Sequence, residues 1–201
     1  FMPTAFLTYA VDGDNDGKVD IWQSEVDALT TAANYLHNIG WQSKERWGRE
    51  VKLPDNFAFE KVAFDQYYSL THFQQLGVQQ TNNQALPAYD IQAELYLPSG
   101  YQGPAFLLYP NFNVIMKWNL SKSYALSVGI LANKLVGAKG VEFIAKAQNQ
   151  AKPYSITEMK NLQSQLNTLG FDTGEPDGIW GPKSRKAIRS FQLQHQLIAD
   201  G

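Results

Sequence analysis

The acidic stretch Asp12–Asp20 constrains the fold of this chain more than any other segment. Its sequence, DGDNDGKVD, places aspartates at alternate positions (Asp12, Asp14 and Asp16), with a glycine directly after them and a helical pattern that begins near Ser24. Alternate side chains of a tight loop converge on one point, and Ca²⁺ prefers six to eight oxygen ligands. This spacing is typical of the first half of an EF-hand calcium loop, so we expect a calcium ion here.

The end of the loop departs from the EF-hand pattern. Its twelfth position, where a bidentate glutamate is usual, holds Gln23, so we expect a longer loop that Asp27 closes. The alternative is a solvated turn, because Asp, Asn and Gly also form ordinary turns. An ion enclosed by protein oxygens has no open position for a substrate, which favours a structural role. The predicted ligands are Asp12, Asp14, Asp16, the backbone carbonyl of Lys18, Asp20 and Asp27.

Composition excludes several classes of protein. The 201 residues carry a net charge of −2 without a basic run, which argues against a nucleic-acid partner. The absence of cysteine excludes disulfides and thiol catalysis, and the three histidines are too far apart in sequence to suggest a zinc site.

We find no signal peptide and no apolar run long enough to span a membrane. Because the chain starts at Phe1 and not at a methionine, we expect a fragment or a processed form of a longer protein.

Hydrophobic periodicity predicts a mainly α fold with a small β element. Helices are expected over residues 24–39 and 119–137, a short strand over 47–53 and a β-hairpin over 94–109. The inward faces of the two helices are expected to carry Val26, Leu29, Ala33, Leu36 and Ile39, and Tyr124, Val128, Leu131 and Leu135 respectively.

The last fifty residues have the pattern of a separate unit. Ser155 and Glu158 have the spacing of a capping box at the start of a helix. Gly170 ends that helix, a turn-rich loop follows, and Pro182 suits the first position of a second helix.

Several separate motifs resemble the lytic murein transglycosylase B family. They are FMPTAFLTYA before the acidic loop, ANY and GW around the end of the next helix, GPAFLLYPNF at 103–112, and MKWN with SYA at 116–125. The segment after residue 154, with DGIWGPKSRKAIRSFQ, resembles the common peptidoglycan-binding module of three short helices. The resemblance implies a lysozyme-like α+β catalytic remainder over residues 1–145, a linker over 146–154 and the wall-binding module over 155–201.

The resemblance also implies a reaction and a location. The family cleaves the β-1,4 bond between N-acetylmuramic acid and N-acetylglucosamine in the periplasm or cell envelope, and one glutamate acts first as acid and then as base. In the family that glutamate precedes the FMPS motif, and no glutamate of this chain has a matching context, so we name no catalytic residue. A non-catalytic wall-binding protein is the alternative. A calcium sensor is disfavoured, because only one acidic loop is present.

The expected partners are peptidoglycan glycan strands and an N-terminal part of the same protein that carries the catalytic glutamate. By resemblance, the residues that contact the substrate are Phe1, Tyr35, Asn111, Trp118, Asn119 and Tyr124, with Asp177 and Trp180 in the module. Two alternatives stay open at this point. Tyr35 and Tyr124 also suit core packing, and Asp177 and Trp180 also suit the structure of their own turn.

Overall fold

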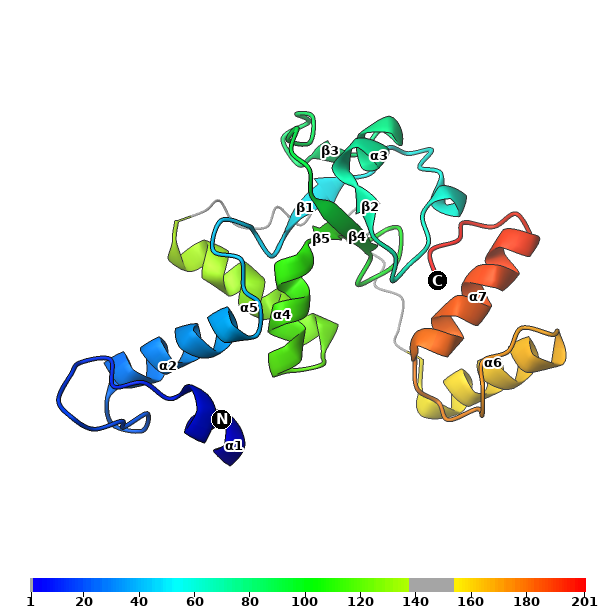
Figure 1. The fold of residues 1–201 in the computed structure, drawn as a ribbon. Helices are drawn as coiled ribbons and strands as arrows, with labels where there is room; N and C mark the ends of the chain where they lie inside the picture. Colours follow the sequence, from blue (N-terminus) through cyan, green and yellow to red (C-terminus); the bar gives the residue numbers. More distant parts are fainter. Residues whose placement is uncertain (1, 138–153) are drawn as a thin grey trace. The chain divides into compact units, whose positions relative to one another are not determined.

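The computed structural model describes residues 2–137 and 154–201, which form seven α-helices and a five-stranded sheet (Figure 1). They divide into two compact units, one of Phe1–Arg49 with Leu108–Gly140 and one of Glu50–Leu107 with Val141–Gly201. Each unit therefore joins stretches that are far apart in sequence. None of the described helices has the length and hydropathy that crossing a membrane requires.

The first unit is helical. It contains α1 (Pro3–Tyr9), α2 (Glu25–Asn38), α4 (Pro110–Trp118) and α5 (Lys122–Leu135). The helix predicted over residues 24–39 is confirmed as α2, and the Ser24 side chain caps it by accepting a hydrogen bond from the amide of Asp27. The second predicted helix is shorter than expected, because Asn119 and Ser121 separate α5 from α4 in extended backbone.

The predicted inward faces of α2 and α5 are wrong in part. Val26 and Leu29 are 49% and 71% exposed, whereas Asp27 and Thr31 are buried. The same holds for α5, where Leu131 and Leu135 are exposed and the buried residues are Ala125, Leu126 and Gly129. The buried face of α2 carries the side chains that hydrogen-bond to the acidic loop. The buried face of α5 carries small residues, which allow another side chain to pack closely against the helix.

Gly129 allows α5 to lie directly against the indole of Trp47. A Cβ atom at Gly129 would lie 2.5 Å from two ring carbons of Trp47. Trp47 is buried, and its Nε1 donates to Oδ1 of Asn133 at 3.3 Å. The ring therefore has little room to move away.

We expect Gly129→Ala to lower the free energy of unfolding by about 1–3 kcal/mol through overpacking. In an exposed helix the same change stabilises by roughly 1 kcal/mol, so the sign of the effect reports the contact with Trp47. Urea unfolding measures it. Ser127→Ala, at an exposed position of α5, is the control and is expected to stay within about 0.5 kcal/mol of wild type. A Gly129→Ala variant as stable as wild type would contradict the packing.

The sheet comprises β1 (Gly48–Lys52), β2 (Tyr68–Ser69), β3 (Gln79–Gln80), β4 (Gln92–Tyr96) and β5 (Ala105–Leu108) in the order β2-β4-β5-β1-β3. β1 pairs antiparallel with β3, and β2 pairs antiparallel with β4. The predicted strand at 47–53 is confirmed as β1, and β4 and β5 are neighbours, as the predicted hairpin requires. The helix α3 (Leu70–Gln75) directly follows β2 and contacts it, and the short 3₁₀ helix η1 (Phe59–Lys61) precedes β2. Phe73 and Phe106 are fully buried in this core.

The C-terminal module contains α6 (Ile156–Thr168) and α7 (Pro182–Gln194). The predicted capping box is confirmed, since the Ser155 hydroxyl accepts from the amide of Glu158 and the Glu158 carboxylate accepts from the amide of Ser155. Residues 154–201 form two α-helices and not the expected three. The predicted linker, residues 146–154, lies outside the described residues except for Tyr154.

Candidate functional site

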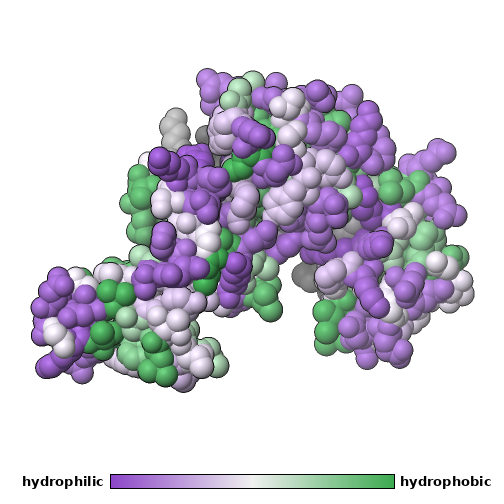
Figure 2. All heavy atoms as spheres, viewed as in Figure 1, coloured by the Kyte–Doolittle hydropathy of each residue, from purple (hydrophilic) through white to green (hydrophobic). Residues whose placement is uncertain are grey.

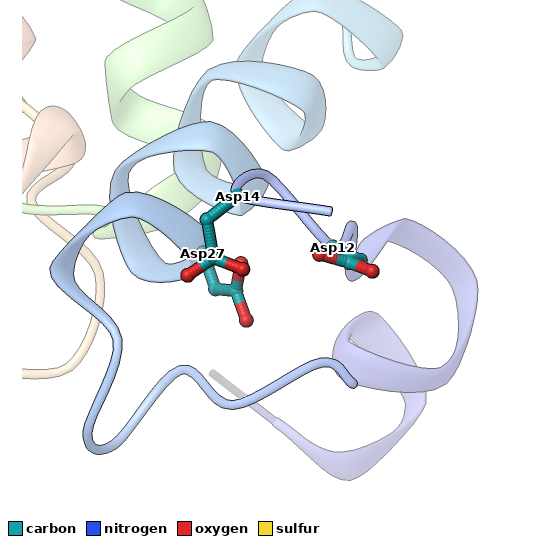
Figure 3. Close-up of side chains that lie close together, drawn as sticks. All are labelled: Asp12, Asp14 and Asp27. Atoms are coloured by element: carbon teal, nitrogen blue, oxygen red, sulfur yellow. The ribbon is translucent and has the colours of Figure 1, made fainter. Parts of the chain in front are cut away.

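The acidic loop runs between α1 and α2, and two of its aspartates come together with one from α2 (Figure 3). One carboxylate oxygen from each of Asp12, Asp14 and Asp27 lies within 4.8 Å of the other two. Asp12 and Asp14 come from the loop, and Asp27 comes from the first turn of α2. Three carboxylates at this separation repel one another, and a cation between them would relieve that repulsion.

Asp27 is the buried member of this cluster and ties the loop to α2. Its Oδ1 accepts from the amide of Gly13 and its Oδ2 accepts from the amide of Asp20, both at 2.7 Å. These two bonds, first that from Asp20 and then that from Gly13, lower the pKa of the Asp27 carboxyl below its usual value. The carboxylate is therefore held in its charged form, which is the form that binds a metal.

The other predicted ligands lie outside the cluster of three. Oδ1 of Asp16 accepts from the amide of Lys18 at 2.8 Å, and Oδ1 of Asp20 accepts from the amides of Trp22 and Gln23 at 3.0 Å. Both side chains thus support their own turns. Gly17 has a φ of +86°, which agrees with the sharp turn expected at this position. Coordination by Asp16, Asp20 and the carbonyl of Lys18 stays a prediction.

Aromatic side chains of the first unit form a continuous run. The ring of Tyr35 meets that of Trp118 edge-to-face at 5.3 Å and that of Tyr9 at 5.1 Å. Trp118 is 41% exposed, as is Tyr124 on α5. Tyr35 thus packs against Trp118, and part of the indole remains exposed to solvent. Sequence reasoning missed Tyr9, although it lies in the FMPTAFLTYA motif.

Asn119 and Phe1 are two further residues for which the sequence predicts a substrate contact. Asn119 is exposed between α4 and α5, and its Oδ1 accepts from the amide of Ser121 at 3.0 Å. Phe1 lies outside the described residues.

The substrate contact predicted for Asn111 is corrected by the structure. Asn111 is fully buried, its Oδ1 accepts from the amide of Gln42, and its Nδ2 donates to the carbonyls of Gln42 and Glu45, all at 2.8–2.9 Å. No part of this side chain reaches solvent, so it cannot touch a glycan. Its role is to hold the turn after α2 against α4.

In the C-terminal module, Asp177 is bound to the module itself. Its Oδ1 accepts from Nε2 of Gln163 at 3.0 Å and from the amide of Ile179 at 2.8 Å. Gln163 is buried and also reaches Ser184 and the amide of Gly178. The structure therefore favours the turn-building role for Asp177, while Trp180 is half-buried in the same turn. Sequence reasoning missed Gln163, whose signal is a polar residue on the apolar face of α6.

The hydrogen bonds on Asp177 predict a pH dependence for the module. The bond from Gln163, and then the one from the Ile179 amide, lower the pKa of Asp177 from its ordinary value of 3.8. A carboxyl whose pKa is lowered by folding stabilises the folded state at pH values above its ordinary pKa. This stability is lost as the pH falls through the pKa of the folded state. We therefore expect the melting temperature of wild type to fall more steeply below about pH 4 than that of Asp177→Asn. Thermal unfolding followed by circular dichroism, with Glu175→Gln as a control, measures it, and equal slopes would contradict the assignment.

The first unit combines a cluster of three aspartates with partly exposed aromatic side chains, and two helices form the C-terminal module. The chain belongs to the transglycosylase SLT domain family, whose model matches residues 1–133. A second family model, described as "Putative peptidoglycan binding domain", matches residues 155–201.

Known relatives agree with this assignment. The crystal structure of SltB3 from Pseudomonas aeruginosa in complex with NAG-anhNAM-pentapeptide is 43% identical, covers 100% of this chain and 53% of its own, and has a TM-score of 0.88. The membrane-bound lytic murein transglycosylase B of Escherichia coli K12 is 29% identical over 144 residues, which are 69% of this chain and 37% of that protein. Slt35 of Escherichia coli in complex with calcium is 26% identical over 68% of this chain and 42% of its own, with a TM-score of 0.52. The chain thus spans about half, or less, of the length of these relatives.

Proposed function

We propose that this chain is part of a peptidoglycan lytic transglycosylase of the periplasm or cell envelope. Such an enzyme cleaves the bond between N-acetylmuramic acid and N-acetylglucosamine and leaves a 1,6-anhydro end. The observation that carries the proposal is the succession of the two families along one chain, the transglycosylase domain over residues 1–133 and the wall-binding domain over 155–201. Two crystal structures of SltB3, in complex with NAG-anhNAM-pentapeptide and with NAG-NAM-pentapeptide, support the same class of substrate.

The half-exposed aromatic side chains are the groups that we assign to glycan binding. An indole or phenol face packs on the apolar face of a sugar ring and buries a large area. Trp118 and Tyr124 are the candidates for such contacts, Tyr35 fixes the orientation of Trp118, and Asn119 offers its amide to the sugar hydroxyls.

We assign the catalytic acid to a part of the protein beyond residues 1–201. A general acid of this kind needs a carboxyl group whose pKa is raised by apolar surroundings. Within the described part of the chain, Glu94 is the single buried glutamate, and it lies in the middle of β4. The same observation favours the alternative function, a non-catalytic wall-binding protein.

An apolar surface of the first unit supports the presence of further chain. Met2, Leu7, Trp22 and Leu29 are each more than 70% exposed, and α1 has no buried residue. Figure 2 shows apolar atoms gathered on the surface of α1 and α2. Exposed apolar surface of this kind normally marks an interaction site. We propose that the part of the protein with the catalytic acid packs on this surface.

We also propose that calcium binds at the acidic loop in a structural role. The cluster of Asp12, Asp14 and Asp27 supplies three hard oxygen ligands, which fit a Ca²⁺ ion. The calcium complex of Slt35 supports this proposal by similarity. The ion would join the loop to the start of α2. Tyr35 of the aromatic run lies further along the same helix.

Digestion of purified peptidoglycan sacculi tests the enzymatic function. The 201-residue chain and a longer form of the same protein are each incubated with sacculi, and the soluble products are identified by mass. We expect 1,6-anhydro-muropeptides from the longer form and binding without release from the 201-residue chain. Release by the shorter chain would overturn our placement of the acid and make Glu94→Gln the first variant to study. Binding without release by both forms would establish the non-catalytic alternative.

A further inference from the structure

The segment that joins α1 to the acidic loop is held along α2 by three hydrogen bonds. Its backbone is extended at Ala10, directly after α1. The bonds are donated by Nδ2 of Asn34 to the carbonyl of Tyr9 (2.8 Å), by the amide of Val11 to Oγ1 of Thr31 (3.0 Å), and by the amide of Gly13 to Oδ1 of Asp27 (2.7 Å).

The spacing of these bonds explains why the segment and the helix fit together. Alternate residues of an extended chain are about 6.6 Å apart, and residues three or four apart on a helix are about 4.5–6 Å apart. Alternate residues of the segment can therefore bond to successive turns of one face of α2. Tyr9 is the first residue of this series, so its main chain is fixed against the second half of the helix.

The side chain of Tyr9 packs against Tyr35, which lies one residue after Asn34 on α2. The ring centroids of Tyr9 and Tyr35 are 5.1 Å apart with an interplanar angle of 81°, and those of Tyr35 and Trp118 are 5.3 Å apart with an angle of 86°. Tyr35 thus makes two edge-to-face contacts, a geometry that aromatic pairs favour. A long side chain on a helix has two common χ1 rotamers, and the contact with Tyr9 favours the one that meets Trp118.

A separate contact holds the backbone near Trp118. Nζ of Lys117 donates to the carbonyl of Ile39 at 2.7 Å, directly after α2. This bond joins the end of α4 to the end of α2 and does not involve Tyr9. Loss of the Tyr9 ring should therefore change the order of the Trp118 indole and leave the end of α4 in place.

We propose that Tyr9 is a positioning residue for glycan binding, which acts through Tyr35 to hold the indole of Trp118 in the orientation that packs on a sugar ring. The proposal rests on the proposed function, because it takes Trp118 as a glycan contact. It assigns a role to α1, a helix without a buried residue of its own. Tyr9 itself does not touch the glycan.

The test follows Trp118 in the 201-residue chain by fluorine NMR, after replacement of its five tryptophans by 5-fluorotryptophan. Trp118→Phe assigns the Trp118 resonance. The probe is the tetrasaccharide of β-1,4-linked N-acetylglucosamine, a glycan without peptide. We expect Tyr9→Leu to shift the Trp118 resonance of the free protein and to weaken binding of the tetrasaccharide about two- to tenfold, as for the loss of one aromatic pair.

Three further variants separate this role from a general effect on folding. Tyr9→Phe keeps the ring, so it should retain both the resonance and the affinity of wild type. Tyr154→Leu makes the first substitution at an exposed tyrosine of the module and should also behave as wild type. Asn34→Ala removes the donor to the Tyr9 carbonyl but keeps all three rings of the aromatic run. It should shift the Trp118 resonance in the same direction by a smaller amount, and it keeps the proposal testable should Tyr9→Leu fail to fold.

The possible failures have different meanings. A Trp118 resonance and an affinity that stay unchanged in Tyr9→Leu would overturn the proposal. Equal losses of affinity in Tyr9→Phe and Tyr9→Leu would also overturn it, because the ring would then not be the group that matters. A wild-type Trp118 resonance that does not respond to the tetrasaccharide would instead contradict the glycan contact of the proposed function.

Discussion

Replacing Asp27 by asparagine is expected to abolish the effect of calcium on the thermal stability of this chain. The substitution removes the buried charge of the Asp12–Asp14–Asp27 cluster. It also turns an amide NH₂ group toward the backbone N–H of Gly13 or of Asp20, both of which now donate to the carboxylate. We expect calcium affinity to fall roughly 10- to 100-fold or more. Differential scanning fluorimetry with added calcium, and with a chelator, measures the shift in melting temperature.

Two further variants distinguish a loss of calcium binding from a general effect on folding. Glu25→Gln removes an exposed carboxylate two residues away on α2 and should leave the calcium effect unchanged. Asp16→Asn should reduce calcium affinity less than Asp27→Asn, because Asp16 lies outside the cluster and accepts from the amide of Lys18. A wild-type melting temperature that does not rise with calcium would leave the loop as an ordinary turn, and the metal proposal would fail.

Substitution of Asn111 by alanine is expected to destabilise the first unit strongly. The change leaves the amide of Gln42 and the carbonyls of Gln42 and Glu45 without their present partner. An unpaired buried polar group costs about 1–3 kcal/mol, so we expect a loss of roughly 3 kcal/mol or more in the free energy of unfolding. Urea denaturation, followed by circular dichroism, measures it.

The same variant tells a structural role from a substrate contact. Asn56→Ala, at an exposed position, should stay within about 1 kcal/mol of wild type and serves as the control. If Asn111→Ala were as stable as wild type yet bound sacculi more weakly, the corrected role would be wrong and the original prediction of substrate contact would be restored.

Local features of this protein could be predicted from its sequence. The start of α2 at Ser24, the capping box of α6, the strand β1 and the pairing of β4 with β5 all follow from residues a few positions apart. Caps, turns and periodicity depend on short-range hydrogen bonds and sterics, which neighbouring residues already fix. The alternate spacing of the aspartates has the same origin, and it correctly indicated that Asp12 and Asp14 lie together, although Asp16 lies outside their cluster.

Tertiary structure decided which side of each element is buried and which side chains meet. The leucines of α2 and α5 repeat at helical spacing, yet Leu29 and Leu131 are exposed. Asp27 and Thr31 accept hydrogen bonds from the loop, and these bonds determine which face of α2 is buried. The large apolar residues of the helix therefore remain at the surface.

Long-range contacts likewise gave Asn111 and Arg189 their roles. Asn111 binds a turn 66–69 residues earlier, and Arg189 binds carbonyls 127–130 residues earlier. Each side chain alone is an ordinary polar residue on a helix. Its partners are backbone groups, which every residue possesses, so no sequence pattern identifies them. The sequence therefore determined the elements, the acidic loop and the family resemblance, and only the packing of distant segments decided which polar groups hold the fold and which remain open to a ligand.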